Sequence, residues 1–314
     1  MGFWCTGAHR ELGRSAVIEA AISAGLATGL VSTPGASEGA SEGASAGGSP
    51  ARAGIPSVQE ADLAEVAEIH FAVANADRLS AVHRRSGGRD GLVTVAVSPL
   101  LSGDAAATTA AARRLWGELG RPNVLVGVLG CSSLLAAITA AGAAGVPLNV
   151  RGLCSAGQVL RTALAFCRGA GRRKGDAPLV CALTMDPAPL EVEVANRLSR
   201  LGEPSAAANG AGQALVVFAS ERLARLRVDR GVLVRLMVNE GRIARPAPEL
   251  DRAQVLSAAV RLAALSRTGL DLEDAAETVT AELGAAERDA YVASLEAASR
   301  DVASQEPSVQ LEHR

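Results

Sequence analysis

The hydrophobic pattern is clearest between Gly91 and Ser155, where short apolar runs alternate with longer alanine-rich segments. The runs are too short for helices and are bounded by glycine and proline, whereas the longer segments have helical spacing. Strands that alternate with helices of this length predict right-handed βαβ units and a parallel sheet. The predicted strands are 92–97, 124–128 and 146–150, and the predicted helices between them are 104–119 and 132–144.

Similar signals continue on both sides of this stretch and complete the predicted fold. The fold class is α/β, a (β/α)8 TIM barrel with additional C-terminal helices, and the chain length of 314 residues suits a single barrel domain over 1–314. The further predicted strands are 2–6, 26–32, 179–184, 213–219 and 231–238, the last being the eighth. The further predicted helices are 8–24, 58–82 and 190–201, and then 253–265, 271–283 and 287–302, which pack on the barrel over 251–303.

A low-complexity segment interrupts the pattern at 35–56. It consists of glycine, alanine and serine with a repeated GASE unit, and it holds too few apolar residues to order itself. Its position between a strand and a helix places it at the barrel mouth. We expect a mobile loop there, and both a plain linker and a closing lid remain open.

The composition excludes several classes of function for the chain. Apolar residues make up 48% of the chain and aromatic residues only 2%, so the core is aliphatic. The net charge is -2 and there is no long basic block, which argues against nucleic acid or a membrane as partner. The first residues lack the apolar core of a signal peptide, and no apolar run reaches membrane-spanning length. We therefore expect a cytoplasmic protein.

Cysteines and histidines give no sign of a metal site. The five cysteines contain no C-x-x-C pair, which is typical of reduced, buried thiols. None of the four histidines falls on a predicted strand beside another ligand type. We expect neither a metal nor another cofactor.

Four motifs carry a family resemblance. They read VTVAVSP, RRLW ending at Trp116, RPNVLVGVLGC and GVPLNVRGLCS. In this order and register they resemble the transaldolase family, in particular its longer bacterial branch, whose signature runs VSxEVxP, A-x-x-LW, RPNxMIKxPAT and GxxVNVTLxFS. The resemblance supports the barrel and implies where a catalytic site would lie.

The resemblance also implies that the family's catalytic residues are replaced. The lysine that forms a Schiff base with the substrate carbonyl corresponds to Gly127, the proton-shuttling glutamate to Ala96, and the aspartate of the first strand to Thr6. Only an amine can condense with a carbonyl to form the iminium. The only lysine of the chain is Lys174, in a predicted helix-to-strand loop on the face opposite the active site.

Polar residues on or beside the predicted strands are the candidates for substrate binding. Arg151, in place of a family threonine, can bind a carboxylate or a phosphate, whereas Pro189 stands where the family has a phosphate-binding arginine. Asp186 and Glu240 are the only candidate general bases near predicted strand ends. The candidate set is Ser32, Thr33, Asn149, Arg151, Ser155, Thr184 and Arg235.

Three functions remain open at this point. The first is a transaldolase-like pseudoenzyme that acts as a binding or assembly partner, either in a homo-oligomer or with another protein. The second is a repurposed barrel enzyme that catalyses proton transfer, elimination or cyclisation on an anionic small molecule, with natural-product biosynthesis as a setting. The third, an active transaldolase, rests on the family name alone.

Overall fold

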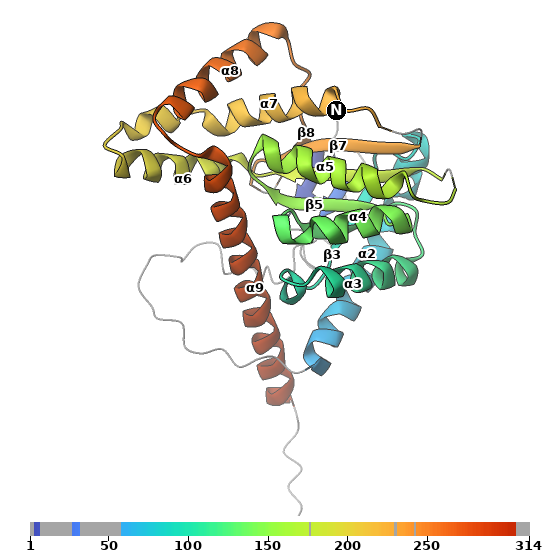
Figure 1. Ribbon diagram of the computed structural model, residues 1–314. Helices are drawn as coiled ribbons and strands as arrows, with labels where there is room; N and C mark the ends of the chain where they lie inside the picture. The colour runs from blue at the N-terminus through green and yellow to red at the C-terminus, as the bar shows by residue number, and fades with distance from the viewer. Residues whose placement is uncertain are drawn as a thin grey trace, which may run out of the picture.

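The computed structural model describes residues 3–6, 27–31, 58–175, 177–228, 231–241 and 243–305. The predicted helix at 8–24, the loop at 35–56, and the candidates Ser32 and Thr33 lie outside these ranges. Eight strands close into a barrel in chain order, which confirms the predicted fold class (Figure 1). They are β1 (Phe3–Thr6), β2 (Ala27–Val31), β3 (Leu92–Ala96), β4 (Val124–Leu129), β5 (Leu148–Leu153), β6 (Leu179–Met185), β7 (Val232–Asn239) and β8 (Ile243–Pro246).

Helices surround the barrel and extend beyond it on one side, where α6, α7 and α8 gather (Figure 1). None of the helices in the described ranges is long and apolar enough to cross a membrane. They are α2 (Val58–Arg85), α3 (Ala105–Leu119), α4 (Leu135–Ala144), α5 (Ala156–Ala170), α6 (Pro187–Arg200), α7 (Ala211–Ala224), α8 (Arg252–Arg267) and α9 (Leu272–Gln305), with short 3-10 turns η2 (Pro99–Leu101), η3 (Ser132–Leu134) and η4 (Ser205–Ala208).

Strand alternation divides the apolar residues between two cores. Outward-facing residues such as Val93 and Val95 pack against the helices in the larger cluster. Inward-facing residues form a smaller cluster around the buried Trp4, in which Leu92 and Leu125 take part. The indole of Trp4 occupies so much of the interior that a Cβ on Gly29 would lie 2.6 Å from it, so glycine is required there.

The prediction of a strand at 213–219 is wrong, because these residues lie inside helix α7. Seven residues of α7 are buried, among them Leu215, Val216 and Val217, since α5, α6 and α8 all pack against the helix. A short run that is apolar on every side looks the same in a buried strand and in a buried helix. Periodicity alone could not separate the two.

Because residues 213–219 are helical, the seventh and eighth strands of the barrel differ from those predicted. The run predicted as the eighth strand is β7, and it pairs with β6 in parallel. The eighth strand is the short β8, which lies between the predicted strand at 231–238 and the predicted helix at 253–265, where no strand was expected. It turns back on β7 and pairs antiparallel with both β7 and β1, thereby closing the barrel.

The C-terminal helices also differ from the prediction. The helices expected at 271–283 and 287–302 are one continuous helix, α9, with Gly284 inside it. A Cβ on Gly284 would lie 2.6 Å from Cδ2 of Leu129, the last residue of β4. The glycine is therefore a point of close packing and does not end the helix. Besides β4, α9 contacts β5 and η2, so it crosses the ends of β3, β4 and β5 where catalytic residues of barrels lie.

Helices α4 and α5 make the closest helix pair on the outside of the barrel. A Cβ on Gly169 of α5 would lie 2.0 Å from the carbonyl oxygen of Thr139, and one on Gly142 of α4 would lie 2.6 Å from the carbonyl oxygen of Phe166. Each glycine thus allows the facing backbone to approach. By contrast, Gly117 in α3 has open space around its Cβ position.

These two kinds of glycine should respond to alanine with opposite signs. Gly169→Ala forces two helix backbones apart and should lower the free energy of unfolding by about 1–3 kcal/mol. Gly117→Ala adds no clash in an exposed helix and should raise it by about 0.5–1 kcal/mol. Urea unfolding of both variants measures the difference. Equal effects of the two substitutions would contradict the packing of α4 on α5.

Candidate active site

The candidate site lies where β3 to β6 end and α9 crosses them. Arg151 of β5 is 9% exposed and points toward α9. Its Nη1 donates to Oε1 of Glu287 at 2.7 Å and its Nη2 to Oε2 at 3.3 Å, which is the two-pronged geometry that arginine forms with a carboxylate. Its Nε is buried without a hydrogen-bond partner among the described residues. Arg151 therefore already binds an anion, and that anion belongs to the chain itself.

Asn149 and Thr184 lie one layer deeper in the barrel and contact each other. The hydroxyl of Thr184 donates to Oδ1 of Asn149 at 2.9 Å, and Nδ2 of Asn149 donates to the hydroxyl of Thr94 at 3.2 Å. All three side chains are buried. The three strands β3, β5 and β6 are thus connected by one chain of hydrogen bonds, which satisfies groups that would otherwise be buried without partners.

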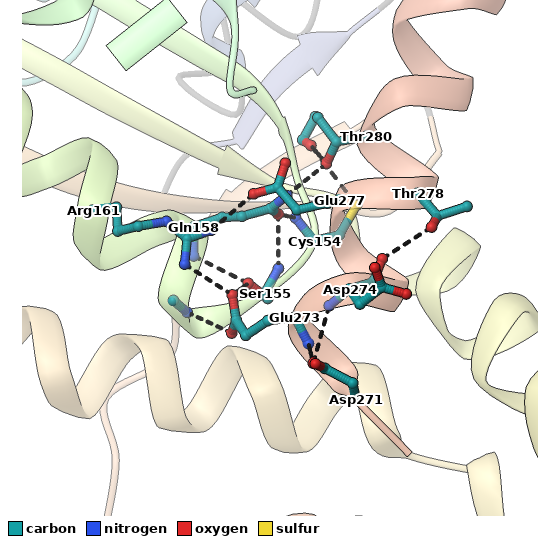
Figure 2. A network of polar contacts seen from close by, with 12 residues as sticks. Cys154, Ser155, Gln158, Arg161, Asp271, Glu273, Asp274, Glu277, Thr278 and Thr280 are labelled. Atoms are coloured by element: carbon teal, nitrogen blue, oxygen red, sulfur yellow. Dashed lines mark hydrogen bonds and ion pairs between the residues drawn. The ribbon is translucent and has the colours of Figure 1, made fainter. Parts of the chain in front are cut away.

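Ser155 begins helix α5 and is fully buried. Its hydroxyl accepts from the backbone N–H of Gln158 at 3.0 Å and donates to Oε2 of Glu273 at 2.8 Å (Figure 2). The backbone N–H of Ser155 in turn donates to Oε1 of Gln158. The backbone N–H of Gly157 donates to Oε1 of Glu273 at 3.1 Å. A helix N-terminus attracts anions, and here the carboxylate of Glu273 occupies that place.

Asp186 follows β6 and lies close enough to Arg151 and Glu287 to interact with their charges. Burial raises the pKa of its carboxyl above the ordinary value of 3.8, although a hydrogen bond from Asn239 and the charge of Arg151 oppose the rise. A carboxyl whose pKa is raised binds more protons in the folded than in the unfolded state. Its contribution to stability is therefore lost as the pH rises from about 3.8 through the folded pKa.

Arg235, the remaining candidate, lies at the other end of the barrel. Its Nη1 donates to Oδ1 of Asp90 at 3.0 Å, just before β3 begins, and its guanidinium lies 5.7 Å from the ring of Trp4. The structure thus joins Asn149 and Thr184 by a hydrogen bond, with Arg151 two residues further along β5, and leaves Arg235 apart from them. Whether any of these residues binds a substrate stays a prediction.

The position that the resemblance aligns with the lysine is tightly enclosed. A Cβ on Gly127 would lie 3.0 Å from Cγ2 of Thr94 and 3.1 Å from Cα of Ala96. The cavity that adjoins Gly127, Arg151 and Glu287 has a volume of about 20 Å³ within the part of the chain that the structure describes. A cavity of this size has room for about one water molecule. Thr6 is the last residue of β1, and the structure describes its backbone alone.

Other reactive groups are distant from the barrel mouth or inert. Lys174 is exposed in the loop that enters β6, at the opposite end of the barrel, as expected. The four cysteines with described side chains are free thiols, and burial raises the pKa of Cys154 to about 12. Within the described ranges, no group of histidine, cysteine and carboxylate side chains could hold a metal ion.

Two residues that determine the site's electrostatics were absent from the candidate set. Glu273 and Glu287 are both on α9, more than 110 residues beyond the partners they contact on β5 and α5. Glu273 lies in the first turn of the helix predicted at 271–283, where an acidic side chain is common and indicates no particular partner. No local pattern connects either glutamate to Ser155 or Arg151, because the contacts exist only after α9 has packed across the strand ends.

The closed barrel, with polar side chains at the ends of its parallel strands, defines the TIM-barrel class of α/β proteins. The family model for transaldolase and fructose-6-phosphate aldolase matches residues 37–200, slightly more than half of the chain. The chain belongs to this family.

Curated relatives match parts of the chain at moderate identity. The chain is 46% identical over 77 residues to "Transaldolase 1" of Streptomyces coelicolor, a match that covers 24% of this chain and 20% of the relative. It is 38% identical over 97 residues to a transaldolase of Thiobacillus denitrificans (31% and 27%) and 33% identical over 160 residues to one of Frankia alni (49% and 42%). The matches thus span between about a fifth and about two-fifths of these relatives.

The ion pair of Arg151 with Glu287 should be more important for stability than ion pairs on the surface. Glu287→Gln leaves a mostly buried guanidinium without its counter-charge and should lower the free energy of unfolding by about 3 kcal/mol. Replacing both partners, as in Arg151→Met with Glu287→Leu, should recover most of this loss, since no charge then stays buried.

Asp77 offers a matched control. It pairs with Arg121 at 2.6 Å in the same two-pronged manner, but both side chains are more than one-third exposed. Asp77→Asn should leave the free energy of unfolding nearly unchanged, because water screens an exposed ion pair. If Glu287→Gln had as little effect in urea unfolding as Asp77→Asn, α9 would not be held to the barrel mouth by this pair.

Proposed function

We propose that this chain is a transaldolase-fold protein without the Schiff-base reaction and that it acts as an assembly partner. The observation that carries the proposal is the pairing of Arg151 with Glu287 across the barrel mouth. Together with Glu273 on the N-terminus of α5, this pair places two carboxylates of α9 where an anionic substrate would bind. A sugar phosphate would have to displace both of them.

The interior position of Gly127 supports the absence of Schiff-base chemistry. The chain has one lysine, and it is exposed at the far end of the barrel. Condensation with a carbonyl requires an unprotonated amine beside the bound substrate. An arginine cannot replace it, because its guanidinium stays protonated at neutral pH.

A role in assembly is supported by the outer face of α8. One side of this helix packs against α7 through Ala258 and Leu265, and the other side carries Leu256 and Val260, which are 65% and 60% exposed. Ala253 and Ala264 extend the exposed side, so it forms an apolar stripe at helical spacing. A helix that is apolar on both sides is typical of one packed between two elements, and a second copy of this chain would supply the missing one.

Asp186 favours a second candidate, a repurposed enzyme acting on an anionic small molecule. Its carboxyl is partly buried next to Arg151, and burial raises its pKa, which favours a role as a group that takes up and releases a proton. In this candidate the anionic group of the substrate would take the place of Glu287 on Arg151. The two candidates agree that no Schiff base forms.

Trapping with borohydride tests for the Schiff base. Fructose 6-phosphate and sodium borohydride should leave the mass of the intact chain unchanged, whereas an active transaldolase run in parallel should gain the reduced adduct. Lys174→Arg, which removes the only lysine, is the matched control for reaction at that amine. An adduct on Lys174 that supports turnover would contradict the proposal, and substrate consumption without any adduct would favour the repurposed enzyme.

Sedimentation velocity tests the assembly. We expect reversible self-association of the wild-type chain, and the double variant Leu256→Glu, Val260→Glu should raise the dissociation constant at least about tenfold, because it places two charges in an apolar contact. Val192→Glu is the control, since Val192 is 62% exposed on α6 and lies outside the stripe. A wild-type chain that stays monomeric at all concentrations, or a control that dissociates equally, would contradict this role of α8.

A further inference from the structure

A pocket of about 560 Å³ lies outside the barrel, between α5, α7, α8 and the first turn of α9. Its walls are mainly apolar, with Leu160 from α5, Leu215 and Phe218 from α7, and Leu262 from α8. Pockets that hold small molecules have volumes of about 300–1,000 Å³ and walls of this kind. The cavity beside Arg151 and Glu287 at the barrel mouth is much smaller, at about 20 Å³.

The pocket exists because α8 turns small side chains toward it. Ala259, Ala263 and Ser266 recur at intervals of four and three residues, so they share the face of α8 that lines the pocket. On α5 the corresponding wall begins with Ala156 and Gly157. The apolar residues of α7 therefore have no large side chains opposite them, and the space between the helices stays open.

The charged side chains that line the pocket differ in whether they form ion pairs. Glu273 accepts from Ser155, from the N–H of Gly157 and from Arg161, and Arg161 also donates to Glu277 (Figure 2). Arg222 differs from these residues. Its guanidinium lies 4.7 Å from the centre of the Phe218 ring, and no carboxylate of the described residues forms an ion pair with it.

We propose that this pocket binds a small molecule with an apolar body and one anionic group, either a carboxylate or a sulfonate. The body would contact the leucines and Phe218, and the anionic group would bind the guanidinium of Arg222. Arginine is well suited to this because it can bind an anion while it stacks on an aromatic ring. The proposal concerns a site outside the barrel and does not depend on the function proposed above.

The fluorescent probe 8-anilinonaphthalene-1-sulfonate has this chemistry and serves as the test ligand. Titration of the full folded chain should give saturable binding with one site per chain. Arg222→Gln should weaken binding about tenfold, since a hydrogen bond to a charged group contributes about one factor of ten. Decanoate should displace the probe, whereas decanol at equal concentration should displace it less.

Two further variants distinguish binding of the probe in this pocket from binding elsewhere on the chain. Arg225→Gln removes a charge from the residue that follows α7, but Arg225 is 78% exposed and pairs with Glu221, so the affinity should stay unchanged. Ala259→Trp fills the pocket from α8 and should abolish binding while urea unfolding shows that the fold is retained. Binding that survives Ala259→Trp, or that weakens equally in Arg222→Gln and Arg225→Gln, would overturn the proposal.

Discussion

Two carboxylates of α9 bind at the end of β5, and the arrangement of the barrel mouth depends on them. Glu287 neutralises Arg151, and Glu273 accepts hydrogen bonds at the N-terminus of α5. Without Glu287, Arg151 would be a mostly buried charge with a large desolvation cost, whereas Glu273, whose side chain is 44% exposed, is less dependent on its partners. The helix and the barrel therefore stabilise each other: α9 crosses the strand ends because its carboxylates find partners there, and the barrel end can keep an inward arginine because α9 covers it.

This arrangement explains why family membership alone does not determine the activity of the chain. A barrel positions its chemistry through a few side chains at the strand ends, and these can change while the core is kept. Here the core packing around β3, β4 and β5 is intact, with Thr94, Asn149 and Thr184 connected in the interior. Above this layer, Arg151 and Glu287 form a contact between the barrel and α9. A pocket of about 560 Å³ lies instead between the outer helices α5, α7 and α8.

Much of the fold could be predicted from local patterns. The strands and helices between Gly91 and Ser155 have clear periods and glycine or proline boundaries, and the structure confirms them. Errors arose where tertiary packing overrides periodicity. The run at 213–219 is apolar all round because three helices enclose α7, and Gly284 lies within α9 because Leu129 packs against it. Among the candidate binding residues, Asn149 and Thr184 form a hydrogen bond and Arg151 lies two residues further along β5, while Arg235 lies at the other end; their role in binding stays a prediction.

The sequence by itself determined the family, the barrel and the inward positions on β4 and β5, because these follow from motifs and from the two-residue period of strands. It also determined that the single lysine lies away from the barrel mouth. Only the tertiary structure decided what Arg151 binds and where the open pocket lies. Its partner Glu287 is 136 residues away. The periodic patterns of strands and helices extend over a few residues and cannot predict a contact across so long a stretch of sequence. This contact arises only when a helix packs across strands that have already formed a barrel.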